Sequence, residues 1–174
     1  MRVEPTALAD LDRVVSLWVA LADEQRAHGS HLTAEPNRDL MREALAQQVV
    51  DHTCLVARAE DDEGATSGAI VGFVSFGLER DGLDRDLVRG VVHNLYVVPA
   101  ARRRGIGSEL LSVAETALVV AGADRVALEA LAANAEARRF YEARGYEAHR
   151  VGYERVSDDE ERGVGDGKDT KGEG

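Results

Sequence analysis

The fold is decided at the stretch Arg102-Arg103-Arg104-Gly105-Ile106-Gly107, which stands between the apolar strand-like run 91–98 and a helix-like pattern. Two glycines let the backbone turn tightly and approach a ligand closely. The N–H groups at the start of a helix, together with the helix dipole, attract anions, and the arginines add positive charge. The stretch therefore predicts a strand-to-helix junction that binds a diphosphate.

Two common nucleotide-binding motifs fit this stretch poorly. A Walker-type loop needs a lysine directly after its last glycine, whereas Gly107 is followed by Ser108 and Glu109. The dinucleotide-binding fingerprint needs a third glycine, which is missing. For this fragment taken alone, an ordinary turn with solvated arginines is the simpler alternative, so the rest of the chain has to decide.

Composition predicts one globular domain. The chain has 174 residues, of which 44% are hydrophobic and 30% charged, enough to bury a single core without disulfides. No window has 18 uninterrupted apolar residues, which argues against a membrane helix. Glu4, Asp10 and Asp12 interrupt the N-terminal segment, which therefore does not resemble a signal peptide. We expect a cytoplasmic protein without a membrane partner.

The charge is strongly acidic. The formal net charge is −11, and only two of the 21 basic residues are lysines. This balance argues against nucleic-acid partners, which favour a basic face. An acidic surface suits a salt-rich cytosol and could also steer a cationic substrate. Residues 157–174 are acidic and glycine-rich with almost no apolar residue, so we expect a domain over 1–156 and a disordered tail over 157–174.

Cysteine and histidine suggest neither a disulfide nor a metal. Cys54 is the only cysteine and lies in a strand-like run, which favours a small core residue over a nucleophile. His28, His31 and His52 do not have the spacing of metal ligands. We therefore expect no metal cofactor.

Apolar spacing predicts an α/β order of elements. Helices are expected where apolar residues recur every three or four positions, and strands where short apolar runs end at turns. The first helix should bury Trp18, and Asn134 or a neighbour should cap the last one. The expected helices are 6–29, 37–50, 104–121 and 134–144, and the expected strands are 53–59, 69–78, 91–98, 125–130 and 146–155. This order predicts a mixed, mostly antiparallel sheet flanked by helices.

Three segments together resemble the GCN5-related N-acetyltransferase (GNAT) superfamily. The sharpest is Arg102-x-x-Gly105-x-Gly107 after its strand, which is similar to the family's acyl-CoA signature. The second runs from Asn134 through Phe140-Tyr141-Glu142 to Gly145-Tyr146, and the third is the opening segment 5–21. The resemblance implies a single-domain GNAT-like fold with a splay between the two central strands, 91–98 and 125–130.

The resemblance also implies acetyl-CoA as co-substrate. Backbone N–H groups from Arg103 to Ser108 would bind its diphosphate, which agrees with the preference of helix starts for anions. The pantetheine arm would lie beside the strand 91–98 like an added strand, and a backbone N–H near Leu95 or Tyr96 could hold the oxyanion. Asn134 would bond the arm, cap a helix, or do both. The implied cofactor-binding residues are Leu95, Tyr96, Val97, Arg102, Arg103, Arg104, Gly105, Ile106, Gly107, Ser108, Asn134 and Tyr141.

Acyl transfer to an amine needs a base and an acid. His93 and Glu129 are the two candidate bases, acting directly or through water, because the attacking amine must be neutral. Each has a plain alternative: a strand histidine bonded to a carbonyl, and a solvated charge at a strand end. Tyr141 resembles the family's general acid, which would protonate the departing thiolate. Its alternative is a tyrosine that bonds the sulfur without acid catalysis.

The function expected is an N-acetyltransferase that transfers the acetyl group directly to a primary amine. The acceptor stays open among small amines, aminoglycoside-like compounds, amino acids and protein amines, and a homodimer is left open too. The first helices and the loop 79–90 would choose the acceptor. The alternative from another class is a noncatalytic acyl-CoA-sensing module, and a nucleotide-phosphate binder is a third reading, disfavoured by the missing lysine.

Overall fold

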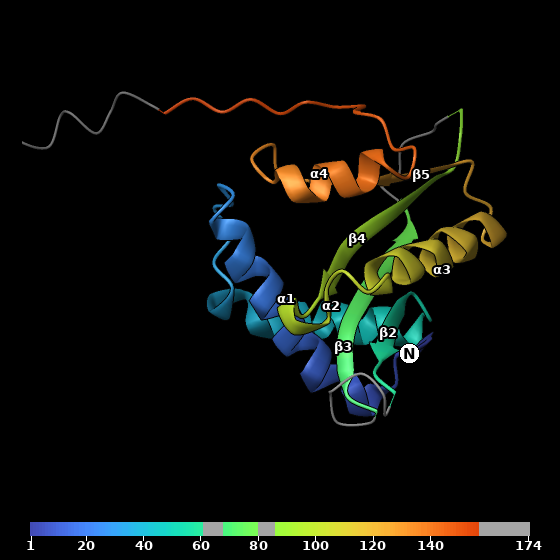
Figure 1. The fold of residues 1–174 in the computed structure, drawn as a ribbon. Coiled ribbons are helices and arrows are strands. Elements are labelled where there is room, and N and C mark those ends of the chain that lie inside the picture. The colour runs from blue at the N-terminus through green and yellow to red at the C-terminus, as the bar shows by residue number, and fades with distance from the viewer. Residues whose placement is uncertain (61–67, 80–85, 157–174) are drawn as a thin grey trace, which may run out of the picture. The chain divides into compact units, whose positions relative to one another are not determined.

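The structure is a computed structural model in which residues 1–60, 68–79 and 86–156 are described (Figure 1). The chain divides into two compact units, Met1–Arg139 and Phe140–Gly174, and each is described by itself. Residues 61–67, between the expected strands 53–59 and 69–78, residues 80–85 of the loop 79–90, and the expected tail 157–174 lie outside the described residues. Among the helices described, none is long and apolar enough to cross a membrane.

The first unit is built on a five-stranded sheet with the order β1-β2-β3-β4-β5. Neighbouring strands are antiparallel from β1 to β4, while β5 runs parallel to β4. Such a sheet confirms the mixed, mostly antiparallel arrangement expected from the sequence. The strands are β1 (Arg2–Pro5), β2 (Cys54–Arg58), β3 (Ile70–Leu78), β4 (Arg89–Val97) and β5 (Arg125–Leu128).

Helices form where the three- and four-residue apolar spacing predicted them. Their ends differ from the predicted ones by only a few residues, as fraying and capping allow. The helices are α1 (Leu11–Arg26), α2 (Arg38–Val50), α3 (Ile106–Val120) and α4 (Ala135–Glu142), with short 3-10 turns η1 (Leu8–Asp10), η2 (Glu35–Asn37) and η4 (Pro99–Ala101). Helix α4 runs across the boundary between the two units.

The sheet of the first unit is covered on both faces. Helices α1 and α2 pack on one face, where Trp18 and Phe73 belong to one buried cluster. Helix α3 packs on β3 and β4 from the other face and buries Leu110 and Leu118 completely (Figure 1). Burying these apolar side chains between helices and sheet supplies most of the stabilising free energy. Trp18 is thus confirmed as a core residue.

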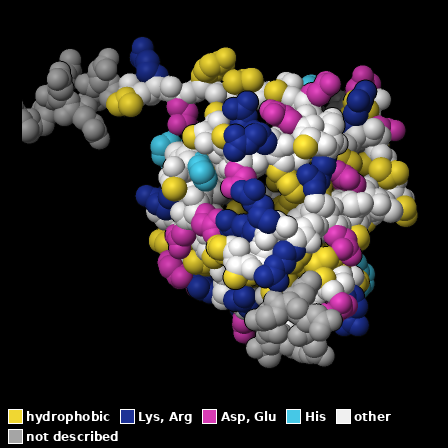
Figure 2. Space-filling model, viewed as in Figure 1, with side chains coloured by type: hydrophobic (Ala, Val, Ile, Leu, Met, Phe, Trp, Pro, Cys, Tyr) yellow, Lys and Arg dark blue, Asp and Glu magenta, His cyan; other side chains and the backbone are white. Residues whose placement is uncertain are grey.

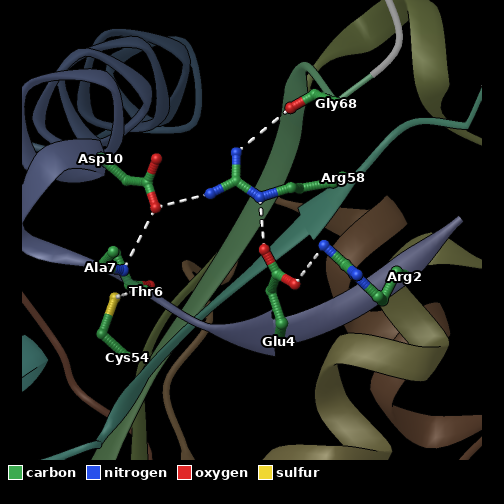
Figure 3. Close-up of polar contacts among 8 residues, drawn as sticks. All are labelled: Arg2, Glu4, Thr6, Ala7, Asp10, Cys54, Arg58 and Gly68. Atoms are coloured by element: carbon green, nitrogen blue, oxygen red, sulfur yellow. Dashed lines mark hydrogen bonds and ion pairs between the residues drawn. The ribbon is translucent and has the colours of Figure 1, made fainter.

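A polar cluster fixes the corner where β1 leads into η1. The guanidinium of Arg58 on β2 donates hydrogen bonds to the carboxylates of Glu4 and Asp10 and to the carbonyl oxygen of Gly68 (Figure 3). All three charged side chains are less than a quarter exposed. We call Arg58, Glu4 and Asp10 the Arg58 cluster. It joins two strands and a helical turn, so its role is structural.

Cys54 lies beside this corner and is fully buried. Its sulfur accepts a hydrogen bond from the Thr6 hydroxyl at 3.4 Å (Figure 3). Burial raises the pKa of the Cys54 thiol to about 11. A thiol with that pKa is almost fully protonated at neutral pH, which confirms a core residue rather than a nucleophile.

Two strand expectations were wrong. Strand β1 was not predicted, because four residues that include Pro5 carry too short an alternation to stand out. The strand expected at 146–155 does not form, and Val151 and Tyr153 are exposed. A strand needs a neighbour with which to pair its backbone groups. The described residues of the second unit hold no other strand.

Candidate active site

The loop before α3 contains two residues in the left-handed conformation. Arg103 has a φ of 64° and Gly105 a φ of 82°, and helix α3 begins at Ile106. The left-handed conformation costs a non-glycine residue about 1–2 kcal/mol. Left-handed residues within such a turn aim successive N–H groups into one concavity, next to the positive end of the helix dipole. A loop of this conformation at a helix start is able to accept an anion.

Arg102 does not extend its charge into this loop. Its Nη2 donates to both carboxylate oxygens of Glu24 on α1, at 2.9 and 2.7 Å, and its Nε donates to the Val97 carbonyl oxygen at 2.8 Å. The place of Arg102 among the cofactor-binding residues stays a prediction. In the structure, the Arg102 side chain is bonded to Glu24 and to the last residue of β4.

Tyr96 completes this group. Its hydroxyl donates to the Glu24 carboxylate at 2.8 Å, and the Arg102 guanidinium carbon lies 5.4 Å from the centre of its ring. Burial, followed by the hydrogen bond to Glu24, raises the pKa of Tyr96 to about 12. We call Glu24, Tyr96 and Arg102 the Glu24 cluster. It ties α1, β4 and the loop together.

The Arg103 side chain is paired with a carboxylate. Arg103 forms an exposed ion pair with Glu136 in the first turn of α4, at 3.1 Å. Arginine side chains lie among acidic ones over the face on which α3 begins (Figure 2). Exposed pairs of this kind contribute little to stability and are easily exchanged for another anion. The local charge is thus mixed rather than purely positive.

Strands β4 and β5 separate as the sequence led us to expect. Their register runs from Arg89↔Arg125 to Val92↔Leu128, yet β4 continues to Val97. Parallel pairing therefore stops halfway along β4. This is the predicted splay, and it leaves the second half of β4 with one paired edge among the described strands.

Backbone alternation identifies the residue that faces the splay. The Val98 N–H donates to Val71 on β3, so the backbone groups of Tyr96 also face β3. Those of Leu95 and Val97 face the opposite way, and the Val97 carbonyl is bonded to Arg102. Of the two residues considered for an oxyanion-binding N–H, Leu95 has the orientation that fits and Tyr96 does not.

His93 occupies a β-bulge. Ser75 pairs with Asn94 but Phe76 pairs with Val92, so His93 is an extra residue in β4. Bulges redirect side chains and are common beside active sites. The imidazole is exposed, and its Nε2 lies 3.7 Å from the point where a Cβ on Gly77 would stand. Partial burial lowers the pKa of His93, so the ring is neutral at pH 7 and can accept a proton.

Glu129 lies at the same level of the sheet. It is exposed and follows directly after β5, just as His93 follows the last paired residue of β4. The structure therefore brings both candidate bases to the point where the two strands separate. Each follows the pair Val92↔Leu128 directly. Leu95, whose backbone groups face the splay, lies two residues after His93 on β4.

Asn134 caps helix α4. Its Oδ1 accepts the Ala137 N–H at 3.0 Å, which is the bond expected of an N-cap residue. The capping alternative is confirmed, while a bond to the pantetheine arm stays a prediction.

Tyr141 belongs to the second unit. Its ring makes edge contacts with Phe140 and Tyr146, at centroid distances of 5.2 and 5.9 Å. Burial raises the pKa of Tyr141 above its usual value. The hydroxyl is therefore protonated at neutral pH and can act as a proton donor.

Three features of the site could not be predicted from the sequence. Glu24 is one of several acidic residues on the polar side of a helix, and no motif marks it. The bulge at His93 and the hydrogen bond from Asn94 to the buried Ser75, at 2.9 Å, depend on how β3 pairs with β4. Only knowledge of which residues of the two strands pair could have predicted them.

Among the described residues, no group of three or more His, Cys, Asp or Glu side chains could hold a metal ion.

The comparisons with known proteins agree with this geometry. The model of the acetyltransferase (GNAT) family matches residues 16–146, which is more than half of the chain. A GCN5-related N-acetyltransferase from Ralstonia eutropha JMP134 is 23% identical, with a TM-score of 0.68 over 89% of this chain and 97% of that one. A comparison with curated proteins gives no match.

Two further solved structures share the fold. An aminoglycoside N-acetyltransferase, AAC(6')-Iy in complex with CoA, is 19% identical, with a TM-score of 0.62 over 90% of this chain and 99% of that one. A transcriptional regulator from Bacillus halodurans C-125 is 20% identical, with a TM-score of 0.66 over 90% of this chain and 99% of that one. At these identities the likeness is one of fold.

Proposed function

The chain belongs to the acetyltransferase (GNAT) family, and from that premise we propose that it is an N-acetyltransferase that moves the acetyl group of acetyl-CoA directly to a primary amine. The observation that carries the proposal is the left-handed turn at Arg103 and Gly105, which begins α3 beside the open half of β4. An anion site and an unpaired strand edge side by side suit a ligand with a diphosphate and an extended, amide-containing arm.

The chain's backbone would hold the donor. N–H groups from Arg103 to Ser108 would bind the diphosphate, while Leu95 would pair with the arm as an added strand does. Arg102 already occupies the Val97 carbonyl. Leu95 is therefore the residue of β4 with both backbone groups directed toward the arm.

The chemistry needs no covalent enzyme intermediate. The amine nitrogen attacks the thioester carbonyl carbon, and the Leu95 N–H stabilises the oxyanion that forms. As the oxyanion collapses, the carbon–sulfur bond breaks. Tyr141 donates its proton to the departing thiolate, a role that rests on the likeness of the segment 134–146 to the family. The proton lost by the amine nitrogen goes to the base.

We propose His93 as that base, directly or through water. Its lowered pKa keeps the imidazole neutral at pH 7, and the bulge sets it at the splay, next to the proposed oxyanion position. Glu129 stands at the same level and is the alternative. Aminoglycoside-like amines are among the proposed acceptors because AAC(6')-Iy shares the fold.

An acetylation screen tests the proposal. The full chain is incubated with acetyl-CoA and a panel of small amines, amino acids, aminoglycosides and peptides, and the release of free CoA thiol is measured in low and high salt, since salt screens an acidic surface. Release above the amine-free rate for at least one acceptor is expected. If the protein binds acetyl-CoA and no acceptor accelerates release in either buffer, the chain is an acyl-CoA sensor instead.

A further inference from the structure

Glu24 holds two functional elements together with one carboxylate. It accepts the Tyr96 hydroxyl from β4 and two hydrogen bonds from the Arg102 guanidinium, which begins the diphosphate loop. Glu24 itself stands near the end of α1, a helix expected to face the acceptor. None of the catalytic steps proposed above uses this carboxylate.

Arg102, the first residue of the loop, is held by hydrogen bonds to two different elements. The guanidinium is bonded to Glu24 on one side and to the Val97 carbonyl on the other. The next residue, Arg103, is left-handed, a conformation that persists only when the surroundings impose it. A fixed Arg102 is such a constraint, since it sets where the chain enters the turn.

Arg102 also limits the open edge of β4. By occupying the Val97 carbonyl it removes that acceptor from the splay and leaves the backbone groups of Leu95 directed into it. The Arg102 side chain thus holds the end of β4 against the start of the loop. Without Glu24, the guanidinium could leave Val97 and both settings would relax.

Simple stabilisation does not account for this arrangement. The Glu24 and Arg102 side chains are 42% and 35% exposed, and ion pairs so exposed contribute little to folding. The exposed pair of Asp12 on α1 with Arg42 on α2 lies far from the loop in sequence and touches no part of it. It provides a matched control for the Glu24 pair.

We propose that Glu24 is a positioning residue for the acyl donor. It acts through Arg102 to hold the diphosphate loop and to keep the backbone N–H and carbonyl groups of Leu95 directed into the splay. The proposal rests on the proposed function, because it names acetyl-CoA as the ligand whose binding Glu24 controls. It adds that the helix facing the acceptor and the loop facing the donor share one carboxylate.

Two readouts on Glu24→Gln and the control Asp12→Asn test it. Amide hydrogen exchange of Ala101 and Arg102, whose N–H groups donate to the Val98 and Pro99 carbonyl oxygens at the entry to the loop, should be about tenfold faster without ligand in Glu24→Gln, as expected for the loss of one charge-assisted hydrogen-bonded contact. Calorimetric titration should show acetyl-CoA binding about tenfold weaker in Glu24→Gln. Asp12→Asn should leave both unchanged, and both variants should keep similar melting temperatures.

A double-mutant cycle with Arg102→Lys separates positioning from local charge. If Glu24 acts through Arg102, the double variant should bind acetyl-CoA about as weakly as either single variant. Additive losses would overturn the route through Arg102. Unchanged exchange of the Ala101 and Arg102 amides in Glu24→Gln would overturn the positioning role, whatever the affinity.

The two hypotheses fail differently. A wild-type protein that binds no acetyl-CoA contradicts the proposed function and, with it, the donor part of the inference. In that case the hydrogen-exchange comparison still decides whether Glu24 holds the loop. A wild type that binds acetyl-CoA as tightly as Glu24→Gln contradicts the inference alone.

Discussion

The first unit has two arginine clusters, one at each end of the segment formed by η1 and α1. Their hydrogen bonds are similar, but their roles differ. Arg58 donates to two carboxylates and a carbonyl oxygen, whereas Arg102 donates twice to one carboxylate and once to a carbonyl oxygen. The Arg58 cluster is the more buried, and Arg58 lies in strand β2, at a shift in the register with β3. The Glu24 cluster is more exposed and adjoins a left-handed residue and an open strand edge.

The difference shows what distinguishes a structural cluster from a functional one. Around Arg58, the described neighbouring segments are strands and turns that pair within the first unit, so the cluster acts on folding. Around Arg102, the neighbouring backbone is left-handed at Arg103, a conformation that its surroundings must impose. We therefore expect changes near Arg102 to act on ligand binding and changes near Arg58 to act on stability.

Adding a negative charge to the loop should have the largest effect on acetyl-CoA binding. Gly107→Glu places a carboxylate in the first turn of α3, where it competes with the diphosphate for the same N–H groups, so acetyl-CoA affinity should fall by about 1,000-fold or more. An acidic residue at a helix start does not weaken the helix, so the melting temperature should hold. Calorimetry on Gly107→Gln separates bulk from charge, and equal binding by all three proteins would place the diphosphate elsewhere.

Removing the proposed acid should be next in size. Tyr141→Phe should lower kcat by about 100-fold while acetyl-CoA affinity stays the same, because general acid catalysis contributes on that order. Steady-state kinetics with the best acceptor of the screen, together with calorimetry, give both quantities. An unchanged kcat would leave Tyr141 a packing residue of the second unit.

Breaking the Arg58 cluster should affect folding alone. Arg58→Met removes the shared partner of Glu4 and Asp10, two largely buried carboxylates, and among the described residues leaves Glu4 paired with Arg2 alone, at a cost of about 2 kcal/mol in the free energy of unfolding. Urea denaturation measures that loss, and Arg42→Met should cost less than about 0.5 kcal/mol because its pair is exposed. A loss of acetyl-CoA affinity in folded Arg58→Met would erase the contrast between the two clusters.

The pH profile should show the smallest of these effects. Burial favours the neutral imidazole of His93, so its folded pKa lies below the reference of about 6.5 and the base is lost only as pH falls through that lower value. The acidic limb of kcat/KM should lie below pH 6.5 in the wild type. In His93→Gln that limb should disappear, with a loss of about tenfold at pH 7.5. A limb that survives in His93→Gln would point to Glu129.

Local patterns were enough to predict the parts of the fold that local forces determine. The apolar spacing of α1 and α3 and the glycines at 105 and 107 carry their information within a few residues, so the helices, the loop and the cap at Asn134 could all be predicted. The splay was predicted from the family resemblance. Its length became visible only in the register, which ends at Val92 and Leu128.

The remaining features depend on partners that are distant in sequence. The bulge at His93 arises from how β3 and β4 align, and Glu24 reaches residues 72 and 78 positions away. No local preference encodes such contacts. The prediction of a strand at 146–155 was wrong for the same reason. The residue pattern is typical of a strand, but a strand also needs a neighbouring strand with which to pair.

The central claim is that the loop from Arg103 to Ser108 holds the diphosphate of an acyl-CoA donor, and the most direct measurement compares two donors by calorimetry. Acetyl-CoA carries the diphosphate, whereas acetyl-pantetheine carries only the arm and the thioester. We predict one acetyl-CoA site per chain, with acetyl-pantetheine binding about 100-fold more weakly or not detectably. Equal affinities for the two donors would contradict the claim.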